Sequence, residues 1–176
     1  MSKRYLEQSW ISPKLYTAPS SIQGTGVFTR QPIKVEEIVI VWGGQLFTQT
    51  DIDKGRVRQQ TMVAIDEGLY LAEPYDADLF IDDYMNHSCD PNVFMKDEVT
   101  LIARRSIEAG EELTLDYATW LNDPSYVLNT ECNCRTPNCR KIMTGNDWKR
   151  PDVQKAYRGH FSPFINHRIE SLNKIG

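Results

Sequence analysis

The 176-residue chain lacks the features that would tie it to a membrane or to the extracellular space. No apolar run approaches the roughly 18 residues that a transmembrane helix needs. The N-terminal MSKRYLEQSWISPK has no apolar segment of the signal-peptide kind, so we expect an intracellular protein, cytoplasmic or nuclear and not secreted. In a reducing compartment cysteines are more often metal ligands or free thiols than disulfides. With 40% hydrophobic and 25% charged residues, the composition is that of one globular domain with a substantial core.

Positive charge is missing from residues 59–95, which contain no lysine or arginine. The same stretch holds eight carboxylates, at Asp66, Glu67, Glu73, Asp76, Asp78, Asp82, Asp83 and Asp90. Because the whole chain carries −4, the remainder carries +4. Two interpretations stay open: an ordinary solvated acidic face, or a surface that attracts a basic peptide and repels nucleic acid. With a pI near 5.4, no direct binding to nucleic acid is expected.

Short strands separated by turns dominate the first two-thirds of the expected structure. Residues 23–26 (QGTG) predict a tight turn, and strands are expected at 27–29, 37–42, 63–65, 69–71, 99–103 and 112–115. The sequence DEG at 66–68 predicts a hairpin between two of these strands. Helix is expected only over 50–60, in a short stretch after Asp123, and in much of the tail, where Pro151 opens a helix.

Three of the four cysteines are crowded into residues 132–139 (CNCRTPNC). Three thiolates this close can wrap one ion but leave a tetrahedral zinc one ligand short. Cys89, in the stretch YMNHSCDPN, is the remaining cysteine and would complete the set. The alternatives are unrelated thiols, a disulfide, or a catalytic pair of Cys89 with His87, which would leave the cluster short of a ligand. We therefore predict one structural zinc per chain, with these metal ligands: Cys89, Cys132, Cys134 and Cys139.

Four sequence blocks occur in the order found in SET-domain protein-lysine N-methyltransferases, and the chain resembles that family. The blocks are GTGVF (24–28) with WGG (42–44), NHSC (86–89) with a following PN, GEELTLDY (110–117), and the cysteine block at 132–139. The last resembles the family's post-SET segment, which shares one zinc ion with the cysteine of NHSC. The likeness covers roughly residues 14–145. It departs from the family in a short insert near 50–80, in Asp83-Tyr84 where Arg-Phe is frequent, and in the absence of a cysteine-rich region before the domain.

The resemblance implies a mainly β (β+α) SET fold of small sheets, with a knot-like C-terminal threading that brings Tyr117 beside Asn86 and His87. It divides the chain into a SET domain over 1–130, with motifs from about 14 to 118, and a zinc-clipped post-SET segment over 131–145. We expect residues 146–176 to form a helical tail packed on the domain. The oligomeric state has no signature in the sequence.

The resemblance also implies S-adenosyl-L-methionine as cofactor and a protein lysine as acceptor. A lysine amine has a reference pKa near 10.4, so presenting it neutral at pH 7 costs about 4.6 kcal/mol. Desolvation and a nearby sulfonium both lower that pKa, so the site needs alignment and a dry channel more than a strong base. Tyr117 occupies the family's terminal catalytic position, and Tyr84 is a second candidate. The ordinary alternative for each is a packed core tyrosine.

The remaining site residues follow from the same motifs. The expected cofactor-binding residues are Gly24, Thr25, Gly26, Val27, Trp42, Asn86, His87, Tyr117 and one of Ile142 and Trp148. The expected substrate channel comprises Tyr70, Tyr84 and Leu115. The family usually has Phe or Tyr at the last of these, so a leucine there leads to the hypothesis that more than one methyl can be added. Turn-stabilising or core roles are the alternatives throughout.

Two functions from different classes follow. The first is an enzyme that methylates a lysine-bearing basic protein, with a histone or histone-like tail as the candidate substrate. The second is a peptide-binding module that keeps the fold but transfers nothing. Asn86 and Tyr117 favour the enzyme, while the departure at Leu115 favours the module slightly.

Overall fold

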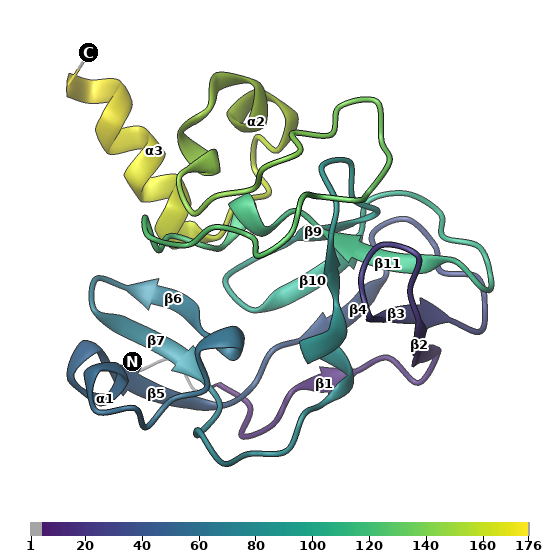
Figure 1. Cartoon of the computed structure of the whole chain (residues 1–176), viewed down its shortest axis with the longest axis horizontal. Helices are drawn as coiled ribbons and strands as arrows, with labels where there is room; N and C mark the ends of the chain where they lie inside the picture. The colour runs from purple at the N-terminus through teal and green to yellow at the C-terminus, as the bar shows by residue number, and fades with distance from the viewer. Residues whose placement is uncertain (1–4, 176) are drawn as a thin grey trace.

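The computed structural model describes residues 5–175, in which eleven short strands form three small sheets (Figure 1). The strands are β1 Trp10–Ile11, β2 Leu15–Pro19, β3 Thr25–Thr29, β4 Ile38–Val41, β5 Gln45–Thr48, β6 Val63–Asp66, β7 Leu69–Ala72, β8 Asn86–His87, β9 Val93–Met95, β10 Thr100–Ala103 and β11 Glu112–Leu115. The helices are α1 Gln49–Asp53, α2 Pro151–Ala156 and α3 Pro163–Ile175, with 3-10 turns at Gln59–Thr61, Ile81–Tyr84, Tyr117–Thr119 and Asp147–Lys149. The predicted mainly β fold with a helical C-terminus is confirmed.

One sheet, in the order β2-β3-β11-β8, carries most of the sequence motifs. β11 pairs antiparallel with β3, with Leu113 opposite Val27, and parallel with β8, with Leu115 opposite His87. Tyr117 follows the end of β11 and therefore lies beside His87, as the resemblance implied. The knot-like threading of this region stays a prediction.

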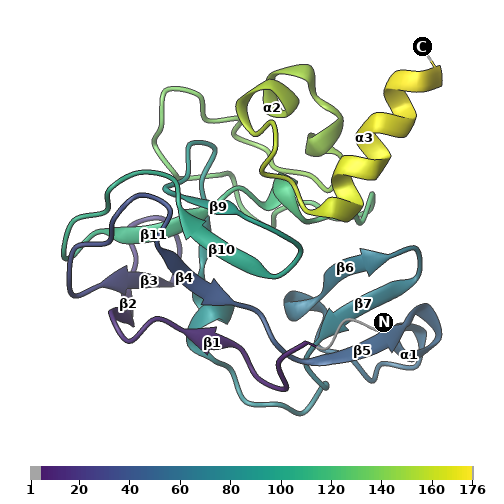
Figure 2. The ribbon, with the colours of Figure 1, turned by 180° about the vertical axis from the view of Figure 1, so that it is seen from behind.

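Two apolar clusters hold the layers together. The first lies between this sheet and the sheet β1-β4-β10-β9, where Val27, Leu101 and Leu113 are fully buried. The second joins β9 and β10 to the C-terminal helices through Phe94, Phe161 and other aromatic side chains. Both views show α2 and α3 on one side of the molecule, with the start of α3 near β6 (Figures 1 and 2). The tail therefore packs on the strands through its own core.

The helix expected over residues 50–60 was mostly wrong. Only α1 forms, because Gly55 turns the chain with a φ of +68° and no residue of α1 is buried to support a longer helix. The helix expected after Asp123 was also wrong, since its carboxylate accepts bonds from the backbone and hydroxyl of Ser125 and fixes a turn. The helix opened by Pro151 was confirmed. Within residues 5–175, the helices are all too short or too polar to cross a bilayer.

Candidate active site and metal centre

The four cysteines converge on one point although 43 positions separate the first two. Their Sγ atoms all lie within 4.8 Å of one another, and those of Cys89 and Cys132 are 4.0 Å apart. A tetrahedral zinc with Zn–S bonds near 2.3 Å would place its sulfurs about 3.8 Å apart. The donor set and its spacing therefore fit a structural zinc that leaves no open coordination position.

Protein groups already favour a thiolate at one of these positions. Burial works against ionisation of Cys134, but hydrogen bonds from Thr136 and from backbone N–H groups outweigh it and lower its pKa to about 6. Burial raises the pKa of Cys89 to about 12. Hydrogen bonding thus favours the thiolate at Cys134, whereas burial disfavours it at Cys89, where a bound zinc would deprotonate the thiol that coordinates it.

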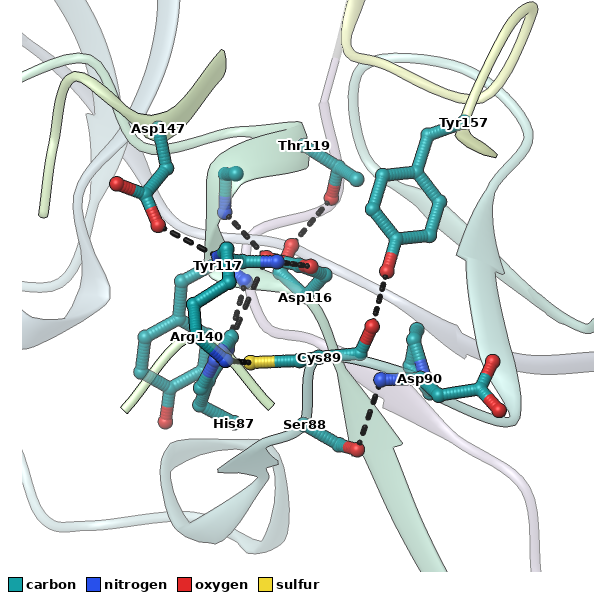
Figure 3. Close-up of polar contacts among 12 residues, drawn as sticks. His87, Ser88, Cys89, Asp90, Asp116, Tyr117, Thr119, Arg140, Asp147 and Tyr157 are labelled. Atoms are coloured by element: carbon teal, nitrogen blue, oxygen red, sulfur yellow. Dashed lines mark hydrogen bonds and ion pairs between the residues drawn. The ribbon is translucent and has the colours of Figure 1, made fainter. Parts of the chain in front are cut away.

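A buried ion-pair network connects the cysteine cluster to the end of β11 (Figure 3). Arg140 follows the last cysteine of the cluster, and its backbone N–H donates to Cys89 Sγ at 3.3 Å. Its Nη1 and Nη2 donate to the two carboxylate oxygens of Asp116 at 2.7 and 2.8 Å, and its Nε donates to Asp147 at 2.7 Å. Asp116 is fully buried, and the side chain of Arg140 is 5% exposed. Breaking such a pair by removing one partner typically costs about 3–5 kcal/mol.

His87 is a neutral anchor in this network. Its Nδ1 lies 3.7 Å from Asp116, but burial lowers the pKa of the imidazole to about 4, so the two do not form an ion pair at neutral pH. Nδ1 accepts the backbone N–H of Tyr117 at 3.3 Å, which assigns the ring proton to Nε2. That nitrogen lies 3.4 Å from Cys89 Sγ and can donate to it.

Asn86 ties the glycine-rich turn to β11. Its side-chain N–H groups donate to the carbonyls of Gln23 and Thr25 and to the carboxylate of Glu112, at 2.9–3.2 Å. A Cβ at Gly26 would lie 2.8 Å from the Cδ of Glu112, so a larger residue at this position requires the Glu112 side chain to move. The amide of Asn86 therefore fixes the backbone of the turn at residues 23–26 through two of its carbonyls.

Tyr117 is a lining residue of two cavities. Its hydroxyl donates to the carbonyl of Met85 at 2.7 Å, and its ring packs against His87 and edge-to-face against Trp120. Burial raises the pKa of Tyr117 far above its ordinary value, so it is a neutral phenol at every physiological pH. The backbone N–H and the hydroxyl of Tyr117 are thus both held by the segment that contains β8.

The larger cavity, of about 1020 Å³, lies between the sheet β5-β7-β6 and the chain that follows β11. Leu115, Tyr117 and Tyr70 line it, and Trp42 packs there edge-to-face with Trp120. The lining carboxylates are Glu67, Glu73, Asp78, Asp82, Asp83 and Asp123. Arg168 supplies the one lining guanidinium among the described residues, and it is paired with one of those carboxylates.

The smaller cavity, of about 10 Å³, is also lined by Tyr117. It is bounded by Ile22 and Gln23, which lead into the glycine-rich turn, by His87, and by the chain that enters the cysteine cluster. The predicted cofactor-binding residues 24–27 and Asn86 do not line it. The side chain of Asn133, between the first two clustered cysteines, donates to the carbonyl of Ser21 at 3.0 Å. This contact closes the post-SET segment onto the turn and keeps the cavity narrow.

Several predicted residues lie apart from both cavities. Tyr84 packs against the first apolar cluster and does not border the large cavity. Ile142 is 64% exposed, and Trp148 is buried in the second cluster at 4% exposure. Sequence reasoning missed Arg140 and Asp116, although the first directly follows a cysteine ligand and the second directly precedes Tyr117. These neighbouring positions in the sequence were the signal that could have identified both residues.

The SET domain family model matches residues 24–118, and the chain belongs to that family. Among curated relatives, it is 30% identical over 153 residues to the histone-lysine N-methyltransferase trr of Drosophila melanogaster. It is 31% identical over 139 residues to histone-lysine N-methyltransferase 2B of Homo sapiens. The alignments cover 78% and 70% of this chain but only 6% and 5% of those much longer proteins.

We predict that the purified protein carries about one zinc per chain and that Cys134→Ser loses it together with much of the folding stability, because three thiolates leave zinc short of a ligand. Metal analysis by mass spectrometry and thermal unfolding would check this. Asn138→Ser, which changes an exposed residue of the same stretch and no ligand, is the control and should keep the zinc. A folded, metal-free wild-type protein that is unaffected by chelators would contradict the prediction.

Proposed function

We propose that this protein transfers a methyl group from S-adenosyl-L-methionine to the side-chain amine of a lysine in a basic protein substrate. The observation that carries the proposal is the position of Tyr117, which borders both cavities. A cofactor on the side of the glycine-rich turn and a lysine entering from the larger cavity would meet at this side chain. The names of the curated relatives, which are histone-lysine N-methyltransferases, support a histone-like acceptor. A nuclear or cytoplasmic location fits such a substrate.

The smaller cavity is the proposed cofactor site. When bound, S-adenosyl-L-methionine supplies an electrophilic methyl group on a sulfonium. Ile22 and Gln23 would bind the cofactor from one side, with His87 and Tyr117 on the other. The predicted contacts of residues 24–27 require the cavity to widen, because these residues do not line it. Trp42 borders the larger cavity instead, so a role for it at the cofactor would be indirect. Of the two candidates after the last cysteine, exposed Ile142 is free to close over a ligand, whereas Trp148 is committed to the core.

Tyr117 would orient the lysine amine without adding charge. It is a neutral phenol whose hydroxyl donates to the Met85 carbonyl, so the phenol oxygen and the carbonyl oxygen can both accept N–H bonds from the amine and leave the nitrogen lone pair free for the methyl group. Leu115 and the aromatic rings of Trp42 and Trp120 exclude water around that position. Desolvation by these side chains lowers the pKa of the lysine and so favours the neutral amine that attacks, whereas the carboxylates elsewhere in the same cavity act in the opposite direction. Alignment and desolvation together supply what a general base would otherwise provide.

The carboxylates of the larger cavity favour a basic peptide. They outnumber the lining guanidinium six to one, and that guanidinium is itself paired with Glu67. A potential of this sign attracts lysine- and arginine-rich segments and weakens with added salt. Tyr70 stands at the same cavity, with its hydroxyl on Gln49, and would border the peptide path.

The experiment that tests the proposal is methyl transfer from labelled S-adenosyl-L-methionine to a panel of histones and other lysine-rich proteins. We expect label on lysine with wild type and a fall in kcat of about 100-fold or more in Tyr117→Phe, because the amine loses its orienting hydroxyl. Tyr126→Phe, which removes a hydroxyl from the same cavity, is the control and should keep most of the activity. Cofactor binding without label on any substrate, in folded and zinc-loaded protein, would favour the peptide-binding module instead.

Leu115 is expected to permit more than one methyl on the same lysine, because it is smaller than the aromatic residue usual in the family and forms a wall of the large cavity. Mass spectrometry of the product at saturating cofactor should detect di- or trimethyl-lysine with wild type. Leu115→Phe should shift the product toward monomethyl-lysine, since the added volume narrows the channel. A wild-type reaction that stops at monomethyl-lysine would contradict this hypothesis.

Asp82→Asn should stabilise the protein at pH 7 while weakening its binding of basic peptides. Asp82 Oδ1 is buried with no hydrogen-bond partner among the described residues, and burial, with the charge of Asp83 adding to it, raises the pKa of Asp82. A carboxyl whose folded pKa exceeds its unfolded value of about 3.9 costs stability as pH rises through that window. The gain, about 1 kcal/mol, should therefore be present at pH 7 and absent near pH 3.5.

The measurements are chemical unfolding at both pH values and the KM for a basic peptide, which should rise several-fold at low salt. Asp76→Asn removes an exposed carboxylate of the same acidic stretch, outside the cavity, and is the control. Equal effects of the two substitutions would argue against a specific role for Asp82.

A further inference from the structure

We infer that Arg140 is a positioning residue for the proposed transfer, because it holds the segment of Asp116 and Tyr117 against the cysteine cluster and so couples zinc binding to the placement of Tyr117. The inference rests on the proposed functions of Tyr117 and of the zinc. It assigns to one arginine a connection between the cysteine cluster and the turn that carries Tyr117.

The contacts form a closed ring around Arg140 (Figure 3). The backbone N–H of Arg140 donates to Cys89 Sγ, and its guanidinium donates to both carboxylate oxygens of Asp116. Asp116 adjoins Tyr117, whose backbone N–H donates to His87 Nδ1. His87 Nε2 lies beside Cys89 Sγ and closes the ring. A shift of any member therefore displaces the others.

Asp116 also shapes the turn that carries Tyr117. Its Oδ1 accepts the backbone N–H of Ala118 at 3.0 Å, and its carbonyl accepts the hydroxyl of Thr119 at 2.8 Å. The carboxylate thus caps the 3-10 turn Tyr117–Thr119 with the same oxygen that receives one arm of Arg140. Fixing the carboxylate fixes the start of the turn, and with it the direction in which the Tyr117 side chain leaves the backbone.

Only a guanidinium suits this position. Asp116 and Asp147 have side chains that are 0% and 7% exposed, and four thiolates around a zinc ion would add two further negative charges nearby. The planar fork of arginine places three N–H groups on the two carboxylates at once. A lysine keeps the charge but is a point donor on a flexible stem, so it cannot hold both carboxylates in the same geometry.

The surface pair of Arg150 and Asp152 provides a matched control, because the same Arg→Lys change there affects an exposed ion pair. Arg140→Lys and Arg150→Lys would be compared for zinc content, for kcat and KM, and for the NMR signals of ¹³C-labelled tyrosine, with Tyr117→Phe assigning the Tyr117 signal. We expect Arg140→Lys to retain zinc, to move the Tyr117 signal and to lower kcat at least tenfold with KM changed less than threefold. Arg150→Lys should change none of these.

A purely structural role predicts a different result, namely a lower Tm with normal kcat in the molecules that remain folded. A folded Arg140→Lys protein with an unmoved Tyr117 signal and a kcat within threefold of wild type overturns the inference. If wild type transfers no methyl group to any substrate, the proposed function fails, but the Tyr117 signal still decides the role of Arg140.

Reciprocity gives a second test that does not depend on Arg140→Lys folding. Coupling between two sites acts equally in both directions, so Asp116→Asn should lower zinc affinity although Asp116 is not a metal ligand. Equilibrium competition with a chromogenic chelator should show at least a fivefold loss, and Asp152→Asn should show none. An unchanged zinc affinity in Asp116→Asn overturns the coupling.

Discussion

The pairing of Arg140 with Asp116 is the contact on which the geometry of the site depends. It is buried and bidentate, and it lies where the cysteine cluster meets the end of β11 in the sheet β2-β3-β11-β8. Strand pairing alone brings Tyr117 near β8, because β8 and β11 run parallel. The turn after β11 needs a further contact to fix it. Arg140, in the post-SET segment, supplies this contact by binding both carboxylate oxygens of Asp116. The tail reinforces the arrangement, since the Tyr157 hydroxyl donates to the carbonyl of Cys89 at 2.9 Å.

Two kinds of buried charge coexist in this small domain. Asp116 and Asp147 share a cation and are fully hydrogen-bonded, so they stabilise one arrangement of the chain. Asp82 and Glu73 at the large cavity are compensated only in part, by a hydrogen bond from Ser9 and by the charge of Arg58 respectively, and burial raises the pKa of both. The fully compensated carboxylates thus belong to the scaffold of the site, whereas the partly compensated ones line the large cavity.

The cysteine cluster and the strands that carry the motifs were predictable because their signals are local. Cys132, Cys134 and Cys139 lie within one short stretch, and a tetrahedral ion demands a fourth ligand. The partnership of Arg140 with Asp116 was not predictable from pattern, since residues 24 positions apart with no shared periodicity leave no local trace. The helix expected over 50–60 failed for a related reason: its polar pattern has no buried face, and tertiary packing decides the length of such helices.

The contact between the Asn133 side chain and the carbonyl of Ser21 affects how a ligand would reach the smaller cavity. It holds the post-SET segment closed over a cavity that is far too small for a nucleoside-sized molecule. If the smaller cavity binds the cofactor as proposed, the segment that carries Asn133 has to move outward before a molecule of that size can enter or leave. A single exposed hydrogen bond contributes only about 0.5–1.5 kcal/mol, so this contact resists that movement only weakly. Asn133 therefore favours the closed segment without preventing exchange with the solvent.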